Sequence, residues 1–405
     1  MRKLMLLLLL VWAQVIASQT TYPDCVRTEM TRLVFPGDTS SFKSLHVKMT
    51  ELTCGNQKRM NILHIGGSHV QAGILTQGIR RHLSDFLDSL TSHRAGSADR
   101  GMLFPYRALK TNAPQDYTIQ ASGEWTGQRN LAKSHSHPMG LAGAYIATAD
   151  SAASLHVVLD SLWSFNQLRL YGHTLTDSIK PLLAIGSDTL EAQRRDSLGW
   201  TFITPRNTCE CTLVVHQSGS DTLYLRGMMP MSEREGLTYT ESGINGASVP
   251  SWLRCELLEQ ELREFMPDLV IFGIGINDAN CYPDKFDADV FKENYRQLIN
   301  RVRKVNPNCS LLFLTNNDCF IGRTRRFNLN TRVVEDAFMQ LAKEYNGAVF
   351  DTYQVMGGYR SSSKWVANKL MRRDHIHFTE EGYRLLADLI SQSIIEEFKR
   401  YHAAR

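Results

Sequence analysis

Apolar runs and amphipathic stretches alternate in the first and last parts of the chain. Several runs are apolar on both faces, as in parallel strands covered by helices on both sides. These strand candidates are residues 61–65, 268–274, 310–315 and 348–351. Stretches with helical periodicity separate them, at residues 41–52, 74–90, 249–265, 286–305, 330–345 and 379–401. The alternation predicts an α/β fold with a doubly wound parallel sheet.

The middle of the chain has a different pattern. Between residues 95 and 235, Gly, Ser, Thr and Asp are frequent, and short runs with strand character replace the helical stripes. Eight such runs predict a β-sandwich. They are residues 117–120, 144–147, 154–159, 167–171, 182–185, 199–203, 212–216 and 222–226. The predicted organisation is a discontinuous α/β domain at 19–94 and 236–405, interrupted by an inserted β-sandwich at 95–235.

The start of the chain has the pattern of a secretory signal peptide over residues 1–18. Arg2 and Lys3 precede an apolar run, Leu4–Ile16, and Ala17 supplies a small residue for cleavage. The run is too short to span a membrane comfortably, so we expect an exported protein. Without Arg2 and Lys3, the formal net charge falls from +4 to +2 (4 − 2). So small a charge does not indicate nucleic-acid binding.

Eight cysteines in an exported chain make disulfides possible. Cys25 with Cys54, and Cys281 with Cys319, are possible pairs, but the sequence leaves the connectivity open. No Cys-x-x-Cys spacing suggests a zinc site.

Four short segments lie where a strand ends or a helix begins, and they carry the candidate chemistry. They are Gly66-Gly67-Ser68-His69, Gly243-Ile244-Asn245-Gly246-Ala247, Gly275-Ile276-Asn277-Asp278 and Asp374-His375-Ile376-His377. Acyl transfer by serine needs a base, an acid that orients the base, and donors for the oxyanion. Ser68 is the candidate nucleophile, His377 the base and Asp374 the acid. The Ser68 N–H, the Gly246 N–H and the Asn277 amide are the candidate oxyanion hole.

These segments resemble the four blocks of the SGNH (GDSL-type) hydrolases, which are named after their Ser, Gly, Asn and His. Ser68, Gly246, Asn277 and His377 match in that order, and Asp374 matches the acid of the last block. The resemblance implies a flavodoxin-like α/β fold and a serine esterase. One departure is Gly67, because the family usually has Asp before the serine, which puts the geometry of the turn in question.

The insertion makes the chain similar to bacterial peptidoglycan O-acetylesterases, which carry a carbohydrate-binding-like β-domain. That resemblance implies removal of acetyl groups from the 6-hydroxyl of muramoyl residues, with no metal or cofactor. The expected partner is therefore an acetylated glycan. Trp125 is the candidate substrate-binding residue, because Gly123, Glu124, Thr126 and Gly127 place it in a loop. Core packing is the alternative for Trp125, as it is for Trp163 and Trp200.

Three functions stay open. The chain could be a peptidoglycan O-acetylesterase, an esterase for other acetylated plant or host glycans, or a catalytically silent glycan-binding protein with the same fold. A metal pair formed by His375 and His377 is a further alternative, although no third ligand cluster accompanies it. The sequence is silent on oligomeric state.

Overall fold

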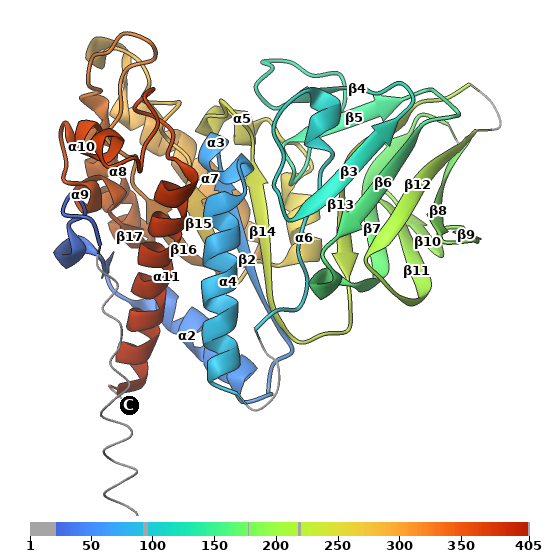
Figure 1. Cartoon of the computed structure of the whole chain (residues 1–405), viewed down its shortest axis with the longest axis horizontal. Helices are drawn as coiled ribbons and strands as arrows, with labels where there is room; N and C mark the ends of the chain where they lie inside the picture. The colour runs from blue at the N-terminus through green and yellow to red at the C-terminus, as the bar shows by residue number, and fades with distance from the viewer. Residues whose placement is uncertain (1–21, 92–95, 177, 218–219, 404–405) are drawn as a thin grey trace, which may run out of the picture.

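The computed structural model describes residues 22–91, 96–176, 178–217 and 220–403. The predicted signal peptide, residues 1–18, lies outside these ranges. A helix-covered sheet and a β-sandwich lie side by side (Figure 1). Within the described ranges, no helix is long and apolar enough to cross a membrane.

Six strands form the sheet of the α/β part, in the order β1-β17-β16-β15-β2-β14. Strands β2 and β14 to β17 pair in parallel, and β1 pairs antiparallel with β17 at one edge. Their bounds are β1 Leu33–Val34, β2 Arg59–Gly66, β14 Gly236–Gly243, β15 Leu269–Gly273, β16 Ser310–Leu314 and β17 Ala348–Phe350. The predicted parallel α/β sheet is therefore confirmed.

Helices cover both faces of this sheet because successive strand side chains point to opposite faces. Ile62 packs into the core beneath α2 (Ser40–Thr53), α4 (Ile74–Ser89) and α11 (Glu380–Ala403), whereas Leu63 and Ile65 pack on the other side. The helices on that other side are α5 Val249–Leu253, α6 Leu258–Phe265, α7 Ala288–Val305 and α8 Asn330–Tyr345. Two short helices, α9 (Thr352–Met356) and α10 (Ser361–Ala367), follow β17.

The single helix predicted over residues 249–265 is wrong, because the chain forms α5 and α6 with a break between them. A capping box of Ser248 and Ser251 starts α5. The break lets the Leu257 N–H donate to the Met139 carbonyl oxygen of the inserted part, at 2.9 Å, rather than to its own helix.

Two antiparallel sheets form the inserted part, in the orders β10-β11-β7-β13-β5-β4 and β3-β6-β12-β8-β9. Their strands are β3 Tyr117–Ser122, β4 Thr126–Arg129, β5 Ala144–Thr148, β6 Ser154–Leu159, β7 Phe165–Thr174, β8 Ile179–Ile185, β9 Asp188–Leu190, β10 Arg194–Asp196, β11 Gly199–Thr208, β12 Glu210–Gln217 and β13 Leu223–Met231. Both sheets contribute to one core, which contains Trp163 and Trp200. The structure thus has the inserted sandwich, while the boundaries 95 and 235 stay predictions.

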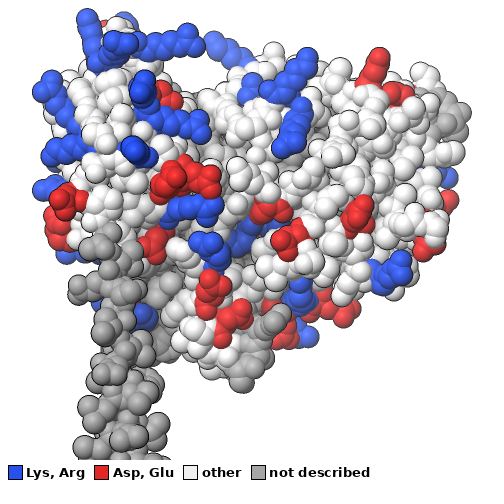
Figure 2. Space-filling model, in the orientation of Figure 1, with Lys and Arg blue, Asp and Glu red and all other residues white. Residues whose placement is uncertain are grey.

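Lys and Arg side chains gather at one end of the molecule, over α10 and the loops beside it (Figure 2). Figure 1 places α3 (Ser68–Gln71) and α5 at the same end, together with β4 and β5 of the inserted part. This is the end at which the parallel strands finish.

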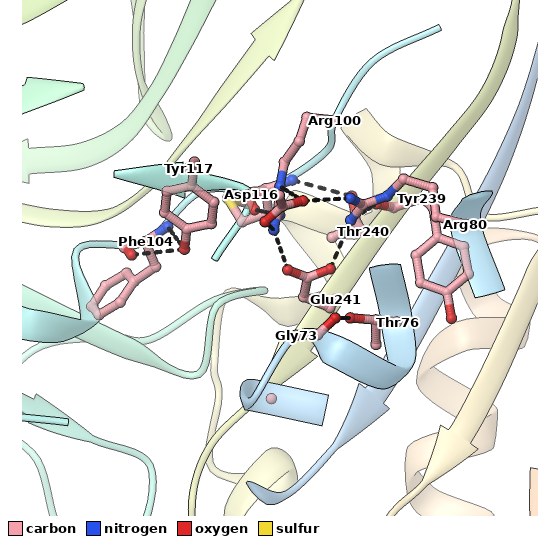
Figure 3. Close-up of polar contacts among 12 residues, drawn as sticks. Gly73, Thr76, Arg80, Arg100, Phe104, Asp116, Tyr117, Tyr239, Thr240 and Glu241 are labelled. Carbon is pink, nitrogen blue, oxygen red and sulfur yellow. Dashed lines mark hydrogen bonds and ion pairs between the residues drawn. The ribbon is translucent and has the colours of Figure 1, made fainter. Parts of the chain in front are cut away.

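Buried charges join the inserted part to the α/β part (Figure 3). Arg80 on α4 and Arg100 face two carboxylates, Asp116 and Glu241. Asp116 bonds Arg80 at 2.6 Å and Arg100 at 2.7 Å, and Glu241 on β14 bonds Arg80 at 2.8 Å and also contacts Arg100. Burial opposes ionisation of Asp116, but Arg100 and Arg80 outweigh it and hold its pKa below the ordinary value. Two positive and two negative charges thus compensate one another inside the protein.

All eight cysteines lie in the described ranges, and each is a free thiol. The pairs considered from the sequence, Cys25 with Cys54 and Cys281 with Cys319, are therefore not bonded. Cys319 is buried and its thiol contacts the Thr331 hydroxyl instead. The fold is held by packing and polar contacts rather than by cross-links.

Candidate active site

The register of three neighbouring strands brings the predicted site residues together. Gly66 at the end of β2 is the Cα partner of Gly243 on β14 and of Gly273 on β15. The three strands therefore finish at one level, and the segments that follow them meet outside the carboxyl edge of the sheet. Gly66 is needed at this point, because a Cβ there would lie 2.3 Å from the Val70 side chain.

Ser68 is the first residue of α3, a four-residue helix. Gly73, at φ 81°, separates α3 from α4, so the long helix predicted from residue 74 is a second element. The Ser68 Oγ lies 2.9 Å from His377 Nε2, and His377 Nδ1 lies 2.9 Å from Asp374 Oδ2. The structure therefore joins the predicted nucleophile, base and acid in one hydrogen-bonded chain.

Asp374 is oriented by its own loop. Its Oδ1 accepts the N–H groups of Ile376 and His377, both at 2.9 Å, while Oδ2 faces the imidazole. Burial raises the pKa of Asp374, but the bonds from His377 and Ile376 outweigh it, so the pKa lies below the ordinary value. The ionised carboxylate favours a proton on Nδ1, which leaves Nε2 to accept the Ser68 hydroxyl proton.

The three predicted oxyanion donors line the same cleft, which has a volume of about 580 Å³. One N–H of the Asn277 amide donates to the Ala247 carbonyl at 2.9 Å, which orients the second N–H. Gly246 has φ 83°, a left-handed conformation that suits glycine. Among the described residues, none accepts the backbone N–H of Ser68 or Gly246. These donors are available to a developing negative charge.

Gly67, where the family usually has Asp, faces the oxyanion amide. A Cβ at this position would lie 3.2 Å from Asn277 Nδ2 and 3.7 Å from the Ala247 carbonyl oxygen. The turn around Ser68 therefore forms without the usual Asp, and the missing side chain leaves Asn277 in place.

Sequence reasoning missed a buried glutamine that holds the oxyanion loop. Gln71 on α3 accepts the Asn245 N–H at 2.6 Å and donates to the Asn112 carbonyl at 2.7 Å and to Thr111 Oγ1 at 3.0 Å. Gln71 thereby ties the nucleophile helix to the loop that contains Gly246, and both to the chain leading into the insert. Gln71 lies only three residues after Ser68, but its partners Asn245, Asn112 and Thr111 are far away in the sequence, so no local pattern indicated its role.

His69 and Tyr383 form a wall behind His377, and sequence reasoning also missed this pair. His69 Nδ1 lies 2.7 Å from the Tyr383 hydroxyl, and the His69 and His377 ring centroids are 5.5 Å apart. Burial lowers the pKa of His69 to about 3, so its ring stays neutral beside His377. A neutral neighbour adds no charge repulsion when His377 becomes protonated.

His375 and His377 have different partners. The His375 ring stacks on Phe320 at 3.9 Å and its Nδ1 lies 3.0 Å from Ser362 Oγ, whereas His377 faces Ser68 and Asp374. In the described ranges, no group of three or more His, Cys, Asp or Glu side chains could hold a metal ion.

Trp125 does not line the catalytic cleft. It is half-buried between β3 and β4, and its indole N–H donates to the Ser122 carbonyl at 3.0 Å. Its neighbours Glu124 and Thr126 line a groove of about 860 Å³ on the insert. A role for Trp125 in substrate binding stays a prediction.

We expect Asn277→Ala to lower kcat by roughly 10²–10³, with a much smaller change in KM, because one oxyanion donor is lost. Steady-state kinetics on a chromogenic acetate would measure it. Asn306→Ala is the control, since this asparagine lies at the opposite edge of the sheet, after α7. An effect of Asn277→Ala confined to KM would contradict the role in the oxyanion hole.

A buried carboxyl beneath the oxyanion loop predicts a pH dependence of stability. Both oxygens of Asp278 accept the Val249 N–H, at 3.0 and 3.2 Å, and burial raises the pKa of Asp278 to about 7. The folded protein keeps a proton that the unfolded chain loses above about pH 4. The free energy of unfolding should therefore fall as pH rises from about 4 to about 7, by on the order of 3 kcal/mol from this group.

Asp278→Asn should remove this component, because the amide can accept the same N–H without titrating. Urea unfolding of both proteins at about pH 5 and about pH 8 would measure the difference. Burial also raises the pKa of Glu335 to about 7. Its contribution to the pH dependence is present in both proteins, so it cancels when the variant is compared with wild type. Equal pH dependence in both proteins would contradict the assignment to Asp278.

Comparison with known proteins gives one family and one fold. Residues 226–385 match the model of the GDSL-like Lipase/Acylhydrolase family. The match includes Gly246, Asn277, Asp374 and His377, whereas Ser68 lies before the insert and outside it. No curated protein sequence matches significantly.

Solved structures resemble the chain at low sequence identity. A peptidoglycan O-acetylesterase has 18% identity and a TM-score of 0.73, over 91% of this chain and 99% of that chain. An acetyl xylan esterase has 20% identity and a TM-score of 0.32, over 39% of this chain and 81% of that chain. A lipase/acylhydrolase from Enterococcus faecalis has 22% identity and a TM-score of 0.33, over 40% and 78%. The first of these has the same fold over nearly its whole length, including the inserted part.

Proposed function

Because the chain carries a GDSL/SGNH-type hydrolase domain, we propose that it is a serine esterase that removes O-acetyl groups from a carbohydrate polymer, most specifically from peptidoglycan. The observation that carries this proposal is the chain of 2.9 Å contacts from Ser68 through His377 to Asp374, beside unused N–H donors. The same intact series of contacts disfavours the alternative of a catalytically silent glycan-binding protein.

In the proposed reaction, Ser68 Oγ attacks the acetyl carbonyl carbon while His377 Nε2 takes the hydroxyl proton. The carbonyl oxygen becomes negative and faces the N–H groups of Ser68 and Gly246 and the Asn277 amide. The C–O bond to the sugar breaks, and His377 returns the proton to the sugar oxygen. Water activated by His377 then cleaves the acetyl-enzyme and releases acetate.

A polymer substrate is supported by the insert rather than by the triad. A Cβ at Gly246 would lie 3.4 Å from the side chain of Leu131, in the loop after β4, and Asn112 lines the cleft, so the insert contributes to its rim. The inserted sandwich also carries the groove lined by Glu124, Thr126 and Tyr224. Contacts to a polymer outside the cleft would orient its acetyl group without taking part in the chemistry.

Acetate release from O-acetylated peptidoglycan, compared with release from acetylated xylan, tests the substrate. We expect a higher kcat/KM on peptidoglycan. A preference for acetylated xylan would favour the alternative of an esterase for plant or host glycans. If the protein hydrolysed neither polymer, the proposal would be rejected.

We also propose that the protein is exported, on the pattern of residues 1–18. N-terminal sequencing of the mature protein from the expressing cell would test it. A mature chain that begins near residue 19 is expected, whereas a chain that begins at Met1 would contradict export through a cleaved signal peptide.

A further inference from the structure

Two stretches near the catalytic cleft carry positive charge and no acidic residue. Residues 319–330 and 357–373 contain no Asp or Glu. They contain eight basic residues: Arg323, Arg325, Arg326, Arg360, Lys364, Lys369, Arg372 and Arg373. The formal charge of the whole chain is +4, so the rest of the chain carries −4 (4 − 8). The excess of basic over acidic residues in this protein therefore lies in these two stretches.

The fold joins the two stretches through a cluster of rings. Phe320 and Phe327 pair across their loop, and His375 stacks on Phe320 at 3.9 Å. The Phe327 ring lies 5.6 Å from the ring of Tyr359, which precedes Arg360. We call the six arginines at positions 323, 325, 326, 360, 372 and 373 the basic rim, and all six are exposed.

The basic rim borders the catalytic cleft directly. Arg372 lines the cleft together with Asn280. Asn280 Oδ1 in turn accepts the Gly322 N–H at 2.7 Å, which anchors the loop of Arg323, Arg325 and Arg326 at the cleft edge. A polymer chain whose acetylated sugar enters the cleft can therefore reach the rim with its neighbouring units.

The guanidinium groups of the basic rim are not neutralised by the protein. No carboxylate of the described residues pairs with any of the six, although nearby Arg332 and Arg384 do form ion pairs. Arg360 lies over the rings of Phe327 and Tyr359, at 5.4 and 5.6 Å, and Arg326 lies 5.9 Å from the Tyr282 ring. Ring contacts orient a guanidinium and leave its N–H donors free.

Tyr282 and Tyr359 are themselves 45% and 52% exposed. Exposed flat rings beside arginines suit a ligand that has both sugar faces and anionic groups. Unpaired like charges on neighbouring loops repel one another, and a partner with negative charge relieves that repulsion. Arginine in particular binds carboxylates through two parallel hydrogen bonds.

We infer that the basic rim binds carboxylates carried by the polymeric substrate, so that the preferred substrate is an acetylated glycan with acidic peptide side chains rather than a neutral acetylated polysaccharide. This inference rests on the proposed esterase function and specifies its substrate class. The rim positions the polymer, and the chemistry stays with Ser68, Asp374 and His377.

The test replaces three arginines of one loop, as R323Q/R325Q/R326Q. At about 20 mM salt, kcat/KM on O-acetylated peptidoglycan should fall roughly tenfold, because long-range attraction of the anionic chain is lost. The loss should shrink as salt approaches about 0.5 M. Hydrolysis of a small neutral acetate ester and of acetylated xylan should stay within about twofold of wild type.

The matched control is K43Q/K58Q/R263Q, which removes three exposed charges near the opposite edge of the sheet. Lys58 immediately precedes β2, and Arg263 lies on α6, which leads into β15. This control should retain wild-type kinetics on every substrate. Equal losses in the control and the rim variant, an equal loss on acetylated xylan, or no loss on peptidoglycan would each overturn the inference.

A binding measurement separates this inference from the esterase proposal. The inactive S68A protein should co-sediment with peptidoglycan at low salt, and adding the three rim substitutions, or converting the peptidoglycan carboxylates to neutral amides, should weaken binding about tenfold. If wild type released no acetate, the esterase proposal would fail, while this rim-dependent binding would still support carboxylate capture. Binding that is unaffected by both changes would overturn the inference. So would displacement of the bound protein by a nucleic acid at a lower concentration of negative charge than soluble peptidoglycan requires.

Discussion

Ser68→Ala should abolish esterase activity, with kcat on a chromogenic acetate lowered by at least about 10⁴. The reason is that Ser68 Oγ lies 2.9 Å from His377 Nε2 and is the atom that would form the acetyl-enzyme. The oxyanion donors would remain and support a small residual rate through direct attack by water. Because Ser68 is not buried, the free energy of unfolding should change by less than about 1 kcal/mol.

Initial rates with matched circular dichroism and urea unfolding would measure both effects. Ser44→Ala is the matched control, since Ser44 is an exposed serine on α2. Retention of more than a small fraction of wild-type turnover by Ser68→Ala would remove Ser68 from the mechanism. A large loss of stability would show that the lost activity reports misfolding instead.

Arg100→Met should destabilise the protein by about 3–5 kcal/mol. Arg100 is 1% exposed, and its loss leaves Asp116 and Glu241 facing one remaining cation, Arg80. The unpaired buried carboxylate would have to take up a proton or admit water. Destabilisation should therefore be smaller at acid pH, where protonation relieves the excess charge.

Urea unfolding at about pH 7 and about pH 5 would measure this difference. Arg384→Met is the control, because Arg384 pairs with Glu380 on the surface, where both side chains are about half exposed. That change should cost less than about 1 kcal/mol. Equal effects of the two substitutions would contradict the idea that the buried network holds the two parts of the chain together.

Hydrophobic patterning predicted the strands that are apolar on both faces and failed at β14. All eight residues of β14 are buried, yet its sequence contains Thr238, Thr240, Glu241 and Ser242. Three of these polar groups have partners on other segments: Thr240 accepts the Met102 N–H, Glu241 pairs with Arg80, and Ser242 donates to the Leu141 carbonyl. A strand whose partners lie far away in the sequence has no local apolar signal.

The cluster of Ser68, Asp374 and His377 was predictable because each candidate comes from a short segment at the end of a strand or in the last loop. Their support was not, since Gln71, His69 and Tyr383 act through contacts that only the fold creates. Likewise, the break between α5 and α6 depends on the Met139 carbonyl, more than 100 residues away. Local periodicity carries no information on such contacts.

The pairing of β2 with β14 also has a consequence for folding. Between Gly66 and Gly236 lie 169 residues (236 − 66 − 1), so the central sheet joins neighbours that are far apart along the chain. Closing a flexible loop of this length costs about 4–5 kcal/mol of chain entropy, against about 3 kcal/mol for roughly 30 residues. A sandwich that folds first shortens the effective loop, so substitutions in its core should slow the assembly of the active site as well as weaken the insert. The cleft that holds Ser68 and Gly246 is then one of the last features to form.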